Sequence, residues 1–115
     1  MSPFQPATLL RLHVCERDRY KGRALHTCIL EKCVELRMTR VTAVCGFEGY
    51  GGSSEIHRSH PIYHNLPVAI TIIDVPDKIS QLLATVEEMM ETGVIATSPV
   101  EMLVVNRRAY VHAAS

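Results

Sequence analysis

The sequence predicts an α+β protein with the ferredoxin-like order βαββαβ, in which two helices cover one face of a four-stranded antiparallel sheet. Strand-like apolar runs occur at residues 9–15, 41–47, 66–75 and 100–106, and two segments with helical periodicity lie between them. The chain has 115 residues and is 47% hydrophobic, which suits one core. We therefore expect a single domain over residues 1–115, with tails at 1–7 and 106–115 and a long loop at 46–66.

The first strand and the first helix are predicted from the spacing of their apolar residues. In LLRLHVC, Leu10, Leu12 and Val14 alternate with polar residues, as in a strand with one buried face. In residues 22–38, apolar residues recur at three- and four-residue steps, which predicts a helix with one packed side.

The second half of the chain repeats this order. VTAVCGF predicts a short strand that ends at Gly46, and LPVAITIIDV predicts a central strand that ends at Asp74. Pro76 suits the first turn of a helix that we expect to end at Gly93. VEMLVVN, residues 100–106, supplies the fourth strand.

Two helices cover only one face of such a sheet, and the other face is rich in apolar residues. It would carry Arg11, His13, Thr42, Val44, Ala69, Thr71 and Ile73. We therefore expect self-association through this face.

Composition excludes several classes of function. Twelve basic and twelve acidic residues give a formal net charge of zero, so the chain has no overall field to hold nucleic acid. No apolar run is long enough to span a membrane, and MSPFQPATLL does not have the pattern of a signal peptide. We expect a cytoplasmic protein whose cysteines, Cys15, Cys28, Cys33 and Cys45, are reduced and mostly buried.

Loop 46–66 is too long for an ordinary hairpin connection, which indicates a functional segment. Its glycines would let the backbone approach a ligand closely, although GYGG matches no established phosphate motif; they are Gly46, Gly49, Gly51 and Gly52. His57, His60 and His64 offer an alternative function as ligands of a divalent metal.

Catalysis is a further alternative, since Cys45 or Ser53 could act as a nucleophile with His57 as its base. No spacing in the sequence places these side chains together, so we expect the protein not to be an enzyme. The sequence is also compatible with a structural adaptor that binds no ligand and acts only through the loop.

Basic residues at two other places could bind an anion. Arg107 and Arg108 follow the last predicted strand, where they could bind an anionic group by bidentate hydrogen bonds or simply solubilise the chain end. Another set could strengthen an anion site at the start of the first helix or remain solvated, namely Arg17, Arg19, Lys21 and Arg23.

Three motifs in this order resemble the short proteins related to the PII nitrogen-regulatory signal transducers. They are RYKGR before the first helix, GFEGYG at the start of the loop and DVPDKI at the second helix. The resemblance extends from about Leu9 to Val105. It implies a homotrimer of ferredoxin-like subunits that binds a small-molecule effector, for many relatives an adenine nucleotide, between neighbouring subunits. It also implies that loop 46–66 corresponds to the T-loop, which engages a membrane transporter, a channel or an enzyme.

The same resemblance supplies candidate ligand-binding residues. Gly46, Gly49 and Gly51 match the glycine-rich base of the T-loop, and Glu48 and Tyr50 belong to the pattern of this subfamily. Thr92 and Gly93 match the nucleotide-binding loop, although VIATSP replaces the glycine- and lysine-rich run that normally follows. Arg107 and Arg108 resemble the basic residues that follow the last strand.

Overall fold

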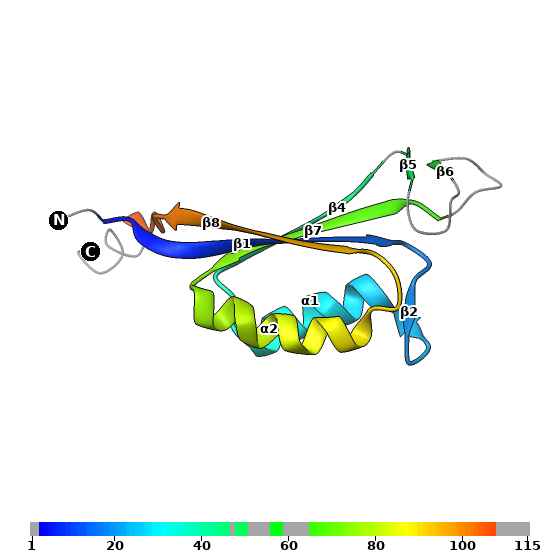
Figure 1. The fold of residues 1–115 in the computed structure, drawn as a ribbon, viewed down its shortest axis with the longest axis horizontal. Helices are drawn as coiled ribbons and strands as arrows, with labels where there is room; N and C mark the ends of the chain where they lie inside the picture. The colour runs from blue at the N-terminus through cyan, green and yellow to red at the C-terminus, as the bar shows by residue number, and fades with distance from the viewer. Residues whose placement is uncertain (1–2, 47, 51–55, 59–64, 108–115) are drawn as a thin grey trace.

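The computed structural model describes residues 3–46, 48–50, 56–58 and 65–107. Its main sheet contains β1 (Gln5–Cys15), β4 (Arg40–Cys45), β7 (Pro67–Asp74) and β8 (Val94–Met102), in the order β4-β7-β1-β8 with every pair antiparallel. The helices α1 (Leu25–Glu35) and α2 (Pro76–Met89) lie along one face of this sheet (Figure 1). The predicted α+β, ferredoxin-like fold is confirmed.

The core lies between the sheet and the helices. Leu10, Leu12 and Val14 of β1 are buried, and so are Val68, Ile70 and Ile72 of β7. Since alternate residues of a strand point to opposite faces, these six side chains share the face that the helices cover. Both strands are central, which the sequence predicted for β7 alone. Each fully buried Leu or Ile contributes about 2 kcal/mol to folding.

The apolar stripe of α1 packs on this face, and its buried residues are Leu25, Cys28, Ile29 and Cys33. The helix ends in a Schellman arrangement, because the amide of Met38 donates to the carbonyl of Cys33 at 3.0 Å while Arg37 has a φ of 54°. Lys78 of α2 donates to the carbonyl oxygen of Arg37 at 2.7 Å and so supports this end.

The start of α2 is held by the end of β7. Pro76 occupies the first turn, as predicted, and the helix buries Ile79, Leu82, Val86 and Met89. The carboxylate of Asp74 is 2% exposed and accepts hydrogen bonds from the amides of Val75 at 2.7 Å and Thr39 at 2.6 Å. It therefore ties the entry into α2 to the segment that precedes β4. No helix in the described part of the chain is long and apolar enough to cross a membrane.

Three predicted boundaries are wrong. The last strand is β8 at Val94–Met102 rather than residues 100–106, and Pro99 does not interrupt it because β8 is an edge strand, where a missing N–H can be tolerated. The predicted tail at residues 1–7 overlaps β1, which starts at Gln5. Helix α2 ends at Met89, so Gly93 lies in the following turn and does not terminate the helix.

Two small hairpins were not predicted. One joins β2 (Arg19–Tyr20) to β3 (Arg23–Ala24) before α1, and the other joins β5 (Glu48–Tyr50) to β6 (Ile56–Arg58) within loop 46–66. Each is short and has few apolar residues, so no alternating pattern marks it in the sequence.

Candidate functional site

The base of loop 46–66 is held to the end of the sheet by backbone hydrogen bonds. The amide of Gly46 donates to the carbonyl of Pro67 at 2.6 Å, and a Cβ on Gly46 would lie 2.7 Å from Cγ of Pro67. The amide of Glu16 donates to the carbonyl of Leu66 at 2.7 Å, which secures the returning chain. Gly46 therefore has a packing role at the loop base in addition to its predicted role in ligand binding.

Within the loop, β5 and β6 pair in the register Glu48 with Arg58, Gly49 with His57 and Tyr50 with Ile56. Of the predicted ligand-binding residues, Glu48, Gly49 and Tyr50 thus lie on one short strand, next to the start of β7 (Figure 1). Gly51 lies outside the described residues. Their role in binding an effector stays a prediction.

The turn between α2 and β8 carries the other predicted loop residues, Thr92 and Gly93. Thr92 lines a cavity of about 50 Å³ together with Asp18, Arg19, Leu25 and Glu91. Two carboxylates line this small cavity, and the Arg19 guanidinium donates to the carbonyls of Glu16 at 3.2 Å and Asp18 at 3.3 Å. One subunit alone therefore offers a poor phosphate pocket here.

Arg107 follows β8, which ends at Met102 opposite Gln5, at the other end of the sheet from Gly93. The nine residues of β8, at roughly 3.3 Å each, separate it from Gly93 by about 30 Å. Arg107 is exposed, and Arg108 lies outside the described residues. Among the described residues, Arg107 is thus not brought together with Thr92 and Gly93 within one chain.

The basic residues before α1 are mostly engaged with neighbours. Besides the contacts of Arg19, both terminal nitrogens of Arg23 donate to the carboxylate of Glu31, at 2.8 and 2.7 Å. This pairing lowers the pKa of the Glu31 carboxyl and raises the pKa of Arg23. Arg19 and Arg23 thus stabilise the local structure. Arg17, Arg19 and Lys21 form no ion pair among the described residues, and of these three only the Arg19 side chain is held by backbone carbonyls.

The thiols divide between core and surface. Cys28 and Cys33 are buried as predicted, whereas Cys45 is exposed and its sulfur lies 3.7 Å from Oε2 of Glu16. Partial burial, the charge of Glu16 and this hydrogen bond raise the pKa of Cys45. A catalytic cysteine needs the opposite shift, so the surroundings of Cys45 do not support the enzyme alternative. Ser53 lies outside the described residues.

The metal alternative depends largely on residues outside the described part of the chain. His60 and His64 are not described, and for His57 only its backbone position in β6 is. Among the described residues, no group of three or more His, Cys, Asp or Glu side chains could hold a metal ion.

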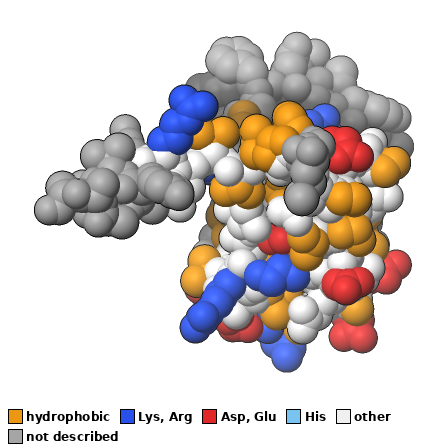
Figure 2. All heavy atoms as spheres, turned by 90° about the vertical axis from the view of Figure 1, so that its left-hand side faces the viewer, with side chains coloured by type: hydrophobic (Ala, Val, Ile, Leu, Met, Phe, Trp, Pro, Cys, Tyr) orange, Lys and Arg blue, Asp and Glu red, His pale blue; other side chains and the backbone are white. Residues whose placement is uncertain are grey.

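The open face of the sheet carries the residues expected there. The pairing of Arg11 with Thr71, Thr71 with Thr42 and His13 with Val94 places them on the face away from the helices. Val44 is 57% exposed and Val94 58% exposed on this face. Figure 2 views the end of the molecule where β1 starts and β8 ends, and hydrophobic side chains are interspersed there with charged ones. The exposed apolar residues Phe4, before β1, and Leu103, Val104 and Val105, after β8, belong to this end.

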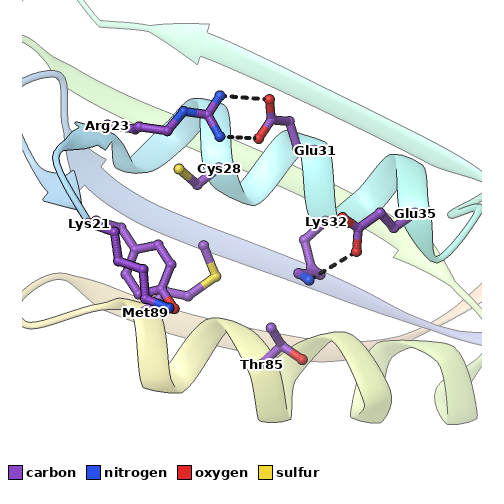
Figure 3. A pocket seen from close by; sticks show the side chains of 9 residues that line it. Lys21, Arg23, Cys28, Glu31, Lys32, Glu35, Thr85 and Met89 are labelled. Atoms are coloured by element: carbon purple, nitrogen blue, oxygen red, sulfur yellow. Dashed lines mark hydrogen bonds and ion pairs between the residues drawn. The ribbon is translucent and has the colours of Figure 1, made fainter.

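A second hollow, which the sequence did not reveal, lies between the two helices. It has a volume of about 310 Å³ and includes Tyr20, Lys21, Thr85 and Met89 (Figure 3). Its residues come from segments far apart in the sequence, so no motif marks it. The one local signal is the dipeptide Lys21–Gly22, in which a lysine occupies a turn position that normally favours asparagine.

Comparison with known proteins identifies the family. Residues 7–102 match the DUF190 family model, described as "Uncharacterized ACR, COG1993". The chain belongs to this family. It is 29% identical over 97 residues to a UPF0166 protein from Aquifex aeolicus (strain VF5), covering 83% of this chain and 91% of that protein.

Solved structures of low sequence identity share the fold of this DUF190 member. One is CPII, a nitrogen regulatory PII-like protein from Thiomonas intermedia K12 bound to ADP, AMP and bicarbonate, with a TM-score of 0.67 and 13% identity over 86% of this chain and 90% of that chain. Another is the divalent ion tolerance protein CutA1 from Ehrlichia chaffeensis, with a TM-score of 0.53 and 14% identity over 90% of this chain and 87% of that chain. The resemblance to PII-like proteins seen in the sequence is confirmed at the level of the fold.

Proposed function

We propose that this protein is a PII-like regulatory protein that binds an adenine nucleotide, or another small anionic effector, between subunits and signals to a partner through loop 46–66. The separation of Thr92 and Gly93 from Arg107 carries this proposal. The two groups lie at opposite ends of β8, so a site that uses both must take them from different copies of the chain.

The open face of the sheet supports such an assembly. Val44 and Val94 are more than half exposed on this face, and Ala69 and Ile73 lie on the same face. Packing this face against other copies would bury them and could bring the end of one subunit beside the loop base of the next. A homotrimer of this kind is the assembly that the resemblance implies.

The loop base is suited to couple a ligand to a partner. Gly46 is fixed against Pro67, and β5 continues directly from this point. An anion bound at the loop base would favour some conformations of the loop over others and so change which partner the loop fits. A membrane transporter, a channel or an enzyme is the kind of partner that the resemblance implies. The solved structure of CPII, which contains ADP, AMP and bicarbonate, suggests the effectors to test first.

A thermal-shift screen against AMP, ADP, ATP and bicarbonate, with the oligomeric mass measured in parallel, tests this function. A ligand at about 100 times its Kd should add about 2.7 kcal/mol of stability. Arg107→Gln should weaken binding, whereas Lys32→Gln, which removes a cation of α1 on the helix side of the molecule, should not. A monomer that responds to none of these compounds would contradict the proposal.

Mixing two variants tests whether the site is shared between subunits. Thr92→Ala and Arg107→Gln should each weaken binding when every subunit carries the change. In mixed oligomers, some interfaces combine the unmodified Thr92 of one subunit with the unmodified Arg107 of its neighbour, so part of the binding should return. A site contained in one subunit would regain none.

Adding zinc and copper to the screen tests the alternative that the loop histidines bind a divalent metal. The fold shared with CutA1 is the reason to test it. In that case zinc or copper would raise the melting temperature, nucleotides would not, and His57→Ala, His60→Ala and His64→Ala would remove the metal response.

A further inference from the structure

The hollow between the helices lies on the side of the molecule opposite the open sheet face. It has a volume of about 310 Å³, and both helices and the β2–β3 hairpin contribute to it. In Figure 3, Glu31, Lys32 and Glu35 lie along α1, and Arg23 reaches Glu31 from β3. Thr85 and Met89 lie on α2, and Lys21 lies at one end of the hollow. Copies that met through the open face would leave this hollow accessible.

The charges around the hollow leave one cation without a carboxylate. Arg23 is paired with Glu31 at 2.7 Å, and Lys32 is paired with Glu35 at 2.9 Å. Lys21 has no ion-pair partner among the described residues, and its Nζ lies 5.3 Å from the centre of the Tyr20 ring. The lining side chains therefore carry a net charge of one positive unit, located at Lys21, beside an apolar surface.

The backbone at this cation is not the one that a lysine prefers. Lys21 and Gly22 form the two-residue turn of the β2–β3 hairpin, with φ values of 51° and 80°. Such a turn favours Asn-Gly, because asparagine tolerates a positive φ better than lysine does. The strained turn places the ammonium group of Lys21 at the end of the hollow. An asparagine at this turn position would make the hairpin more stable but would place no charge there.

We propose that this hollow binds a small organic monocarboxylate with an apolar body. The carboxylate would pair with the ammonium of Lys21, and the apolar part would lie against the Tyr20 ring and Met89, which is 5% exposed. The single unpaired cation balances one negative charge, and the second charge of a dianion would lie unbalanced in a hollow that Glu31 and Glu35 also line, so inorganic phosphate and nucleotides fit it poorly. The site is thus distinct from the proposed effector site and does not depend on it.

Phenylacetate is a suitable probe, with phenylacetamide as its uncharged counterpart and inorganic phosphate as a second comparison. In an NMR titration of the full chain, phenylacetate should shift the backbone amide signals of Tyr20–Ala24 and of α2 near Thr85 and Met89 in a saturable way. Phenylacetamide and phosphate should not. No saturable shift with phenylacetate, or an equal response to phosphate, would overturn the proposal.

Lys21→Asn separates binding from folding. This substitution removes the charge and installs the preferred turn residue, so it should weaken phenylacetate binding about tenfold or more while the melting temperature stays the same or rises. Arg17→Gln is the matched control, because it removes a nearby exposed cation that does not line the hollow, and it should leave binding unchanged. Unaltered binding by Lys21→Asn would overturn the proposal. Lys21→Asn should leave the response to AMP unchanged.

Discussion

Gly93 lies so close to His13 that a Cβ on Gly93 would come within 2.6 Å of the carbonyl oxygen of His13. Gly93 also has a φ of 127°, a conformation that other residues rarely adopt. Gly93→Ala therefore meets both backbone strain and a contact with backbone that cannot move easily. We expect it to lower the free energy of unfolding by about 2–3 kcal/mol, measured by urea denaturation.

Gly22→Ala is the matched control for that prediction. Gly22 has a φ of 80°, but a Cβ on it would meet no atom within 4 Å. We expect a loss of only about 1 kcal/mol, due to the backbone conformation alone. Equal losses in the two variants would show that the contact between Gly93 and β1 is not what makes the glycine necessary.

The buried carboxylate of Asp74 gives the second prediction. Asp74→Ala leaves the partly buried amides of Thr39 and Val75 without their acceptor, so we expect a loss of about 2 kcal/mol in urea denaturation. Asp77→Ala is the control. Asp77 is exposed in the first turn of α2, and its loss should cost about 0.5 kcal/mol through the helix dipole. A similar small effect of both changes would contradict the anchoring role of Asp74.

Sequence periodicity located the elements whose burial is regular. In β1 and β7, alternate residues are buried, and the stripe of each helix faces the same core, so their spacing alone predicts them. Strand β8 has no such pattern in its first half. Val94, Ala96 and Ser98 are exposed on the open face, and Pro99 suggests a break, so the strand appears in the sequence only from Val100 onward.

The candidate site was less predictable because its arrangement depends on that strand. Because β8 starts at Val94, Arg107 lies at the far end of the sheet from the loop. No local sequence pattern predicts this separation. The pairing of Arg23 with Glu31 and the hollow beside Lys21 are likewise products of packing between separate elements. Sequence motifs could suggest which residues matter but not which of them share a site.

The end of α1 gives the third prediction. Arg37 occupies the position after the helix where a left-handed residue is required, and glycine is the residue most often found there. Arg37→Gly should raise the free energy of unfolding by about 0.5–1 kcal/mol, because it removes the strain on Cβ and keeps the carbonyl that accepts from Lys78. A higher urea midpoint with an unchanged m-value would support this, whereas a lower midpoint would mean that the arginine side chain stabilises the helix end.

Burial of Cys33 gives the fourth prediction, which concerns alkaline pH. Burial raises the pKa of this thiol from 9.0 to about 11. Below about pH 9 the thiol is protonated in both the folded and the unfolded chain, so its contribution to stability is fully present. Between about pH 9 and 11 the unfolded chain loses a proton that the folded chain keeps. The free energy of unfolding should therefore fall by up to about 1.4 kcal/mol per pH unit from this group.

Urea denaturation of the wild type and of Cys33→Ala from about pH 8 to about pH 11 separates this effect from other alkaline titrations. The variant should be less stable than the wild type at about pH 8, because a buried sulfur is lost from the core. Its stability should then decline less steeply with pH, because the lysines and tyrosines that both proteins share still titrate but the buried thiol does not. The two curves should converge as pH rises, and parallel curves would mean that Cys33 ionises in the folded protein as readily as in the unfolded chain.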